Sequence, residues 1–307
     1  MDTGGQELLI IGAGPAGLAA AVMARRGGLN PLVLEKSHSG GTLRTARWVE
    51  NYPGFPQGVE GWHLAEQIVH QADTFQVRAV RAEVNRIERL PSGVYALDTG
   101  TSQLKARAVI AAWGAKWRSL GVLGEAEAMG NRIFNTMAEY QEVAGQNMSG
   151  RDLLVVGGGD VALDQAMALA DRGARVTLAV RSAEMAAAAH LCSQLERARV
   201  QVRQSCVAEG FTLAANSLRV AFREEGQVRE DAYHAVLVCV GRQADTSLLP
   251  AGAGDPLAAD AWGRTALPGL YVAGDLRRGP DRHTAIAVGD GQSAALDAIR
   301  YIRGESI

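Results

Sequence analysis

The hydrophobic residues of this chain occur in short runs that are separated by glycine-rich turns. The first run, residues 8–11, has no polar face, which is typical of a strand buried in a parallel sheet. Gly12, Gly14 and Gly17 follow it with the spacing G-x-G-x-x-G, and a helical pattern begins there. This arrangement predicts a β-α-β unit whose helix N-terminus faces the pyrophosphate of a dinucleotide.

An acidic residue at the end of the next strand strengthens that prediction. The apolar residues 32–34 lead into Glu35, roughly 20 residues after the glycines, where such a fold places an acceptor for ribose hydroxyls. The alternative interpretation is a glycine-rich turn that binds no ligand.

The following part of the chain predicts a long loop, a helix and a small meander. Residues 37–60 are rich in glycine and proline and indicate a shaped loop, in which Gly40 and Gly41 exclude regular structure. Apolar residues recur every fourth position over 61–75, which predicts an amphipathic helix. Strand patterns separated by turns over 76–111 predict an antiparallel meander, and a short helix is expected around 137–143.

The opening pattern then recurs. A buried strand at 153–156 leads into Gly157, Gly159 and Ala162 as G-x-G-x-x-A, followed by a helix at 163–171 and a strand at 176–180. Each unit of this kind can hold one pyrophosphate, so the repeat predicts two dinucleotide sites. Further strands are expected at 235–240 and within 269–275, and a last helix at 284–301.

Composition and charge argue against several classes of binding partner. The net charge of −2 favours neither nucleic acid nor an anionic membrane, and no apolar run approaches the ~20 residues that span a bilayer. The first strand leaves no room for a signal peptide, so we expect a cytoplasmic protein. The three cysteines, Cys192, Cys206 and Cys239, show neither C-x-x-C nor metal-ligand spacing, and no metal is expected.

The chain resembles the two-domain, low-molecular-weight thioredoxin reductases of the pyridine nucleotide-disulfide oxidoreductase superfamily. The segments that carry the resemblance span nearly the whole length: IIGAGPAGLAAA, GGTLRTARWVENYPGFPQGVEG, VVGGGDVALDQA, VCVGRQADTSLL, GLYVAGDLRRG and RHTAIAVGDGQSAALDAIRYI. The resemblance implies an α/β fold of two Rossmann-like, three-layer ββα domains, the second inserted in the first. Residues 1–113 and 242–307 would bind FAD, residues 114–241 would bind NAD(P)H, and the protein would be a homodimer.

The resemblance also implies which residues contact the cofactors. FAD would lie against Gly12, Gly14, Pro15, Ala16, Gly17, Glu35, Lys36, Gly41, Thr42, Leu43, Asn51, Ala112, Gly114, Gly274, Asp275, Arg282, His283, Thr284 and Ala285. NAD(P)H would lie against Gly157, Gly159, Asp160, Val161 and Arg181.

Two of the FAD residues have competing interpretations. Asp275 either contacts FAD or serves as a helix N-cap. His283 replaces the glutamine that is usual in the family, and it is our candidate catalytic residue. It would stack on the flavin, donate a hydrogen bond or relay a proton, or else it is a polar filler of similar size.

One departure from the family pattern decides the functional prediction. Thr136 and Glu139 occupy the places of the two cysteines of the family's C-x-x-C, so dithiol exchange at this position is chemically excluded. A pairing of distant cysteines, such as Cys192 with Cys206, stays open. Trp113 and Trp117 also depart from the pattern; we expect changed packing, with shielding of the flavin as the alternative.

The second dinucleotide unit lacks a ribose-binding acid. Val180 stands at that position and Arg181 follows it. A guanidinium pairs with a 2′-phosphate, so NADPH is favoured over NADH, although the family's second arginine is a serine here. The alternative is a vestigial site that binds no nicotinamide.

The leading hypothesis is therefore an FAD-dependent NAD(P)H oxidoreductase without a redox-active dithiol. Its flavin would pass electrons directly to an external acceptor, with ferredoxin favoured over a free flavin, a quinone-like molecule or a disulfide protein. One alternative is a flavoprotein that is reduced by a protein donor and has a degenerate NAD(P)H site. The other is a flavin-binding sensor or interaction module that performs no turnover.

Overall fold

The computed structural model describes residues 5–305, which form two compact units. The first unit comprises the chain up to residue 44, residues 49–116 and the chain from residue 243. The second comprises Thr45–Trp48 and Trp117–Arg242. Each unit has its own sheet and its own hydrophobic clusters.

The sheet of the first unit is built on parallel strands. Its order is β3 (Arg78–Arg81), β2 (Leu32–Glu35), β1 (Gln6–Ile11), β6 (Gln103–Ala111), β5 (Tyr95–Asp98) and β4 (Arg86–Arg89), and β17 (Leu270–Val272) also pairs with β6. The antiparallel meander is confirmed for β4, β5 and β6. It is wrong for β3, which pairs in parallel with β2 because its half-buried Val80 lies opposite Leu34 and joins the core there.

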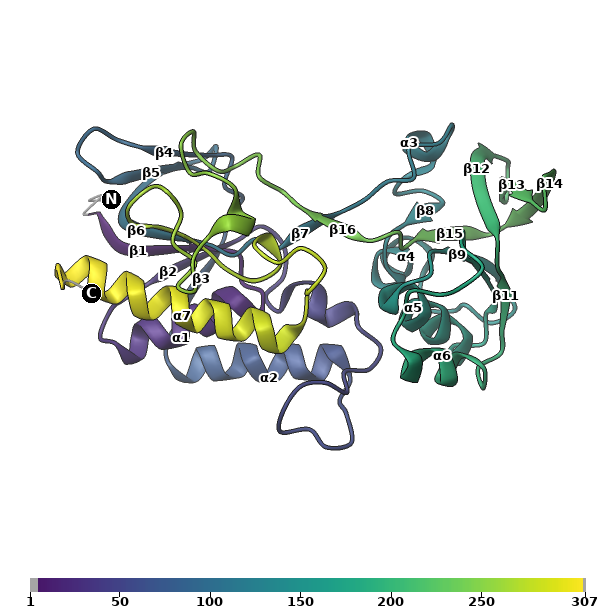
Figure 1. The fold of residues 1–307 in the computed structure, drawn as a ribbon, viewed down its shortest axis with the longest axis horizontal. Helices are drawn as coiled ribbons and strands as arrows, with labels where there is room; N and C mark the ends of the chain where they lie inside the picture. Colours follow the sequence, from purple (N-terminus) through teal and green to yellow (C-terminus); the bar gives the residue numbers. More distant parts are fainter. Residues whose placement is uncertain (1–4, 306–307) are drawn as a thin grey trace. The chain divides into compact units, whose positions relative to one another are not determined.

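Three helices cover one face of this sheet: α1 (Pro15–Arg26), α2 (Gly61–Thr74) and α7 (Thr284–Arg303) (Figure 1). The predicted helices at 61–75 and 284–301 are thereby confirmed. Alanine and glycine let α7 approach α1 closely, since a Cβ on Gly291 would lie 2.0 Å from the carbonyl oxygen of Ala16. This contact holds the start of α1 against α7.

The long loop after β2 is more ordered than the glycines predict. A 3-10 helix, η1 (Gly41–Thr45), begins at the second of them, so the prediction that Gly41 excludes regular structure is wrong. Gly40 donates its N–H to the carbonyl of Ala13 at 2.7 Å, which fixes the helix start beside β1. Farther on, Val49 and Val59 exchange two backbone hydrogen bonds of 2.8 and 3.0 Å and close the loop tip.

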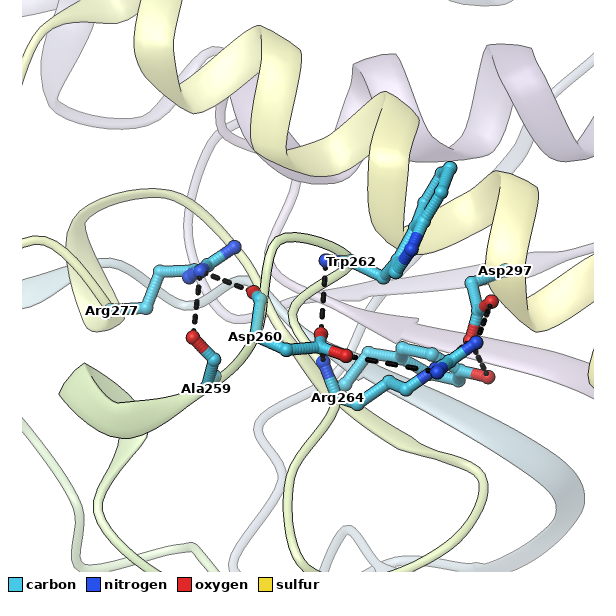
Figure 2. Close-up of polar contacts among 7 residues, drawn as sticks. Ala259, Asp260, Trp262, Arg264, Arg277 and Asp297 are labelled. Atoms are coloured by element: carbon cyan, nitrogen blue, oxygen red, sulfur yellow. Dashed lines mark hydrogen bonds and ion pairs between the residues drawn. The ribbon is translucent and has the colours of Figure 1, made fainter. Parts of the chain in front are cut away.

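A second loop, which contains η2 (Pro256–Ala258), is fastened to α7 by a buried carboxylate (Figure 2). Arg264 donates to both oxygens of Asp297 at 2.7 and 2.6 Å, and the Tyr271 hydroxyl donates to the same carboxylate at 3.0 Å. Asp260 accepts the backbone N–H groups of residues 262 and 264, and Arg277 donates to two carbonyls of the loop. The loop and the helix therefore form one polar cluster next to the end of β17.

The second unit contains a parallel sheet between a helical and an antiparallel layer. The sheet order is β11 (Val200–Arg203), β10 (Arg175–Ala179), β9 (Asp152–Val156), β15 (Ala235–Val238) and β8 (Ile133–Phe134). The helices α4 (Met137–Ala144), α5 (Asp160–Asp171) and α6 (Ala189–Leu195) cover one face. The strands β12 (Cys206–Leu213), β13 (Leu218–Glu224) and β14 (Gln227–Tyr233) cover the other. The three-layer ββα architecture is confirmed.

The remaining elements are short. They are α3 (Glu125–Ala128), η3 (Gly274–Leu276), and the paired strands β7 (Ala115–Trp117) and β16 (Arg242–Ala244). The helix predicted at 163–171 begins three residues earlier, at Asp160, because Gly159 is its N-cap. None of the helices in the described range is long and apolar enough to cross a membrane.

Candidate functional site

The first glycine turn is shaped by contacts that only glycine allows. Gly12 has φ +100°, and a Cβ there would lie 2.5 Å from the carbonyl oxygen of Ala112. A Cβ on Gly17 would lie 1.9 Å from the carbonyl oxygen of Gly12. The carboxyl ends of β1 and β6 therefore meet at backbone distance, as a dinucleotide-binding edge requires.

The second glycine of the turn faces open space. Gly14 is the N-cap of α1, and apart from the adjacent backbone no described atom lies within 4 Å of the position that its Cβ would take. No side chain caps this helix start in the described residues, and its first turn carries no acidic residue. Gly41 lies alongside, since its Cβ would be 3.1 Å from the Gly14 Cα. This open cradle, with polarised N–H groups, fits the pyrophosphate of FAD.

Glu35 is fixed by backbone donors on both of its oxygens. Its carboxylate accepts the N–H of Ala13 at 2.7 Å and the N–H of Ser37 at 2.8 Å. Each oxygen keeps further lone-pair capacity, so the same group can accept from ribose hydroxyls. The sequence predicted the acid, whereas its link to Ala13 became visible only in the structure.

The other predicted FAD residues approach from a third part of the chain. The carboxyl end of β17 leads into Gly274, whose Cβ would lie 2.9 Å from the Cβ of Ala16. Arg282 donates to the carbonyl of Asp275 at 3.3 Å. Asp275 is not a helix N-cap, because Ala273 has that position in η3.

Asn51 and His283, which are 232 positions apart, also come together. The Asn51 amide nitrogen lies 3.3 Å from Nδ1 of His283, and both residues are exposed. His283 is the N-cap residue of α7, but its side chain caps none of the N–H groups of the helix.

The remaining FAD candidates lie around this edge of the sheet with differing exposure. Pro15 is in the first turn of α1, Thr284 and Ala285 begin α7, Gly114 has open space beside it, Leu43 is buried in η1, and Lys36 and Thr42 are exposed. Leu43 therefore contributes its backbone or its packing rather than an exposed side chain.

The glycine turn of the second unit repeats the geometry of the first. A Cβ on Gly157 would lie 2.3 Å from the carbonyl oxygen of Cys239, and its N–H donates to Ala179 at 3.0 Å. Gly159 is the N-cap of α5, and apart from the adjacent backbone no described atom lies within 4 Å of its Cβ position. The carboxyl end of β9 therefore carries a second open turn whose shape fits a pyrophosphate.

The segment that follows β10 is hydrogen-bonded to this turn. Ala186 donates its N–H to the carbonyl of Gly158, and Ala188 donates to the carboxylate of Asp160, both at 2.8 Å. Asp160 thus holds the loop in addition to any contact with a nucleotide. Val161 is half-buried. Arg181 is exposed two residues after the end of β10, where a fold of this kind would recognise a 2′-phosphate.

The two positions that carry the family's C-x-x-C cysteines lie at the start of a helix in this structure. Thr136, only 2% exposed, is the N-cap of α4, and its hydroxyl accepts the N–H of Glu139 at 3.2 Å. The Glu139 carboxylate reaches back and accepts the N–H of Asn135 at 2.8 Å. The second bond differs from that of a capping box, because the carboxylate accepts from the residue before the N-cap, but both side chains satisfy backbone donors at the helix start.

The same helix start is joined to segment 45–48 through the first turns of α5. The buried Gln165 accepts the N–H of Met137 at 2.7 Å and donates to the carbonyl of Thr45 at 2.9 Å. Asp164 accepts the N–H groups of Arg47 and Trp48 at 2.8 and 3.4 Å. Burial raises the pKa of Asp164 above its ordinary value, although these donors oppose the rise. The sequence contains no local signal for either contact.

The three cysteines are free thiols, so the open pairing of Cys192 with Cys206 is not formed. Cys192 is half-buried, and Cys206 and Cys239 are buried. Burial raises the pKa of the Cys206 and Cys239 thiols, which disfavours the thiolate needed for exchange.

The two unusual tryptophans take part in packing. The Trp113 indole N–H donates to the carbonyl of Asp245 at 2.9 Å, and its ring packs among Leu249 and its apolar neighbours. The guanidinium of Arg242 stacks over Trp117 at 5.4 Å. These contacts support the packing interpretation.

Comparison with known proteins gives one consistent result. Residues 6–291 match the family model described as pyridine nucleotide-disulphide oxidoreductase. A thioredoxin reductase of Treponema pallidum is 32% identical over 96% of this chain and 97% of its own length. One of Mycolicibacterium smegmatis is 34% identical over 96% of both chains. The crystal structure of Lactococcus lactis thioredoxin reductase in its FR conformation superposes with a TM-score of 0.88 at 25% identity, covering 97% of this chain and 99% of its own.

Proposed function

Because the chain is an oxidoreductase that belongs to the pyridine nucleotide-disulphide oxidoreductase family, we propose that it passes electrons from NADPH through FAD directly to an external acceptor. FAD and NADPH are the cofactors of the thioredoxin reductases in this family. When bound, FAD accepts two electrons and releases them singly or as a pair. Ferredoxin is the acceptor that we favour.

The observation that carries this proposal is the pair of hydrogen bonds that Thr136 and Glu139 make to backbone N–H groups at the start of α4. Both side chains hold the start of α4, and neither can form a disulfide. The three free cysteines are half-buried or buried, so none of them replaces an exposed redox pair. Electrons on the flavin therefore lack a dithiol to receive them within this chain.

We propose that each unit binds one of the two cofactors at its glycine turn. We assign residues 1–113 and 242–307 to FAD, because Glu35 supports the ribose there and Gly14 opens the space for the pyrophosphate. We assign residues 114–241 to NADPH, because Gly159 opens a second such space and the exposed Arg181 can pair with the 2′-phosphate. A homodimer is part of the proposal.

The test is anaerobic reduction of the FAD-loaded protein, followed by reoxidation. We expect NADPH to bleach the flavin faster than NADH does, and oxidised ferredoxin to restore the colour. A thiol titration of the denatured protein should find the same number of thiols before and after reduction. Free FMN, a quinone and oxidised thioredoxin are the comparison acceptors.

Each other result points to a different function. New thiols, or turnover with thioredoxin, would show that a disulfide route exists and would overturn the proposal. Bleaching only by reduced ferredoxin would favour a protein electron donor with a degenerate nucleotide site. A flavin that no donor reduces would indicate a binding or sensor module.

A further inference from the structure

The contact between Asn51 and His283 has a chemical direction. The Asn51 Nδ2 atom lies 3.3 Å from Nδ1 of the imidazole ring. With the amide NH₂ group as the donor, Nδ1 is the acceptor in this contact and carries no hydrogen. The neutral ring then carries its hydrogen on Nε2.

Both partners are held in place by backbone structure. Asn51 belongs to the loop tip that the Val49 and Val59 hydrogen bonds close. His283 is the N-cap residue of the 20-residue helix α7, and its carbonyl accepts the N–H of Ala287 at 2.9 Å. Its ring makes no capping bond to the helix and is exposed, so Nε2 is available to a ligand.

We propose that Asn51 is a positioning residue that fixes His283 in the Nε2–H tautomer, so that His283 presents one N–H donor to the bound flavin. This inference rests on the proposed FAD site in the first unit. The N-terminus of α7 adds its polarised N–H groups beside the ring. The His283 N–H donor and the N-terminus of α7 both favour an electron-rich ligand. Together they stabilise the reduced flavin relative to the oxidised flavin.

The tautomer can be measured without any turnover. ¹⁵N NMR of histidine-labelled protein distinguishes a ring nitrogen that carries hydrogen from one that does not, and His283→Gln identifies the signals of His283 among the six histidines. At a pH where the ring is neutral, we expect Nε2–H in the wild type. Asn51→Asp should reverse the tautomer, because a carboxylate can only accept from Nδ1–H. A wild-type signal with hydrogen on Nδ1 would overturn the proposal.

The effect on the flavin is measured as its midpoint potential. His283→Phe removes the donor and should shift the potential to a more negative value, equivalent to a roughly ten-fold weaker preference for reduced flavin. His283→Gln keeps an N–H donor and should stay near the wild type. His70→Phe, at an exposed histidine on α2, is the matched control and should have no effect.

A double-mutant cycle tests whether Asn51 acts through His283. Asn51→Leu has a similar shape and adds no charge, and it should shift the potential in the same direction as His283→Phe but less. In the His283→Phe background it should have little further effect. Additive shifts would mean that Asn51 acts on its own and would overturn its positioning role.

FAD content separates the two failures. If the wild-type protein does not retain FAD, the proposed function fails. If FAD is retained in all variants and His283→Phe leaves the potential unchanged, only this inference fails.

Discussion

At the scale of single residues, Asp297 shows how a buried charge fastens a loop of the first unit to α7. Its carboxylate is 3% exposed and accepts from Arg264 and Tyr271. Burial alone would raise its pKa, but the Arg264 and Tyr271 hydrogen bonds outweigh burial and lower the pKa. A carboxylate with a lowered pKa stabilises the fold above its unfolded pKa, and this stabilisation is lost as pH falls through the folded value.

We predict that Asp297→Asn destabilises the protein by about 3 kcal/mol at pH 7. The value lies at the lower end of the range for broken buried pairs, because Arg264 keeps 41% of its side chain exposed to water. The measurement is urea unfolding followed by circular dichroism. The difference from wild type should be constant above about pH 5 and shrink as the solution is acidified below about pH 4.

The matched control for this prediction is Asp73→Asn, an exposed aspartate on α2. It should change stability by less than about 0.5 kcal/mol. A pH-independent loss in the Asp297 variant would show that packing, rather than the ion pair, is responsible.

At the scale of elements, variants at the start of α4 test whether Thr136 has a structural or a catalytic role. Thr136→Ala removes the acceptor for the Glu139 N–H, so we predict a loss of about 1 kcal/mol of stability. Thr136→Ser keeps the acceptor and should be close to wild type. Neither variant should alter the rate at which NADPH reduces the flavin in stopped-flow absorbance.

A large loss of flavin reduction in Thr136→Ala, together with a normal unfolding curve, would contradict the structural role. The Ser variant makes this comparison informative, because it retains the hydroxyl and changes only the methyl group.

Local patterns predicted most elements, whereas pairing between distant strands was harder to predict. The buried run before Gly12 and the spacing of apolar residues in α2 and α7 are determined by nearby residues, so these elements were predicted well. Strand β3 is four residues long and three of them are exposed, so its parallel partner is not visible in its own sequence. The start of α5 was misplaced because Asp160 continues a glycine run.

In the candidate site, too, local sequence predicted some features, and others depend on contacts between distant parts of the chain. The glycine spacing is a sequence signal because the backbone leaves no room for a side chain at Gly12 and Gly17. Glu35 is a signal because a carboxylate at the end of the second strand can accept hydrogen bonds. The contact of Asn51 with His283 joins positions 232 apart and depends on the loop path. The attachment of segment 45–48 to the second unit depends on Asp164 and Gln165, which have no sequence pattern in common with that segment.

At the scale of the whole molecule, the two units have separate hydrophobic clusters. The cluster of Ile10, Ala20 and Ala298 belongs to the first unit, and the cluster of Leu153 and Leu178 belongs to the second. Units with separate cores can unfold in separate steps, and a ligand stabilises only the unit that binds it.

We therefore predict two thermal transitions in calorimetry of the FAD-loaded protein. A ligand at 100 times its dissociation constant adds about 2.7 kcal/mol to the unit that holds it. Excess FAD should raise the transition of the first unit, and NADP⁺, which binds without reducing the flavin, should raise the transition of the second. Arg181→Ala is the internal control: it should weaken the NADP⁺ shift and leave the FAD shift unchanged, because Arg181 belongs to the second unit alone. If both ligands raised one shared transition, the two units would unfold together, and the prediction of separate transitions would be wrong.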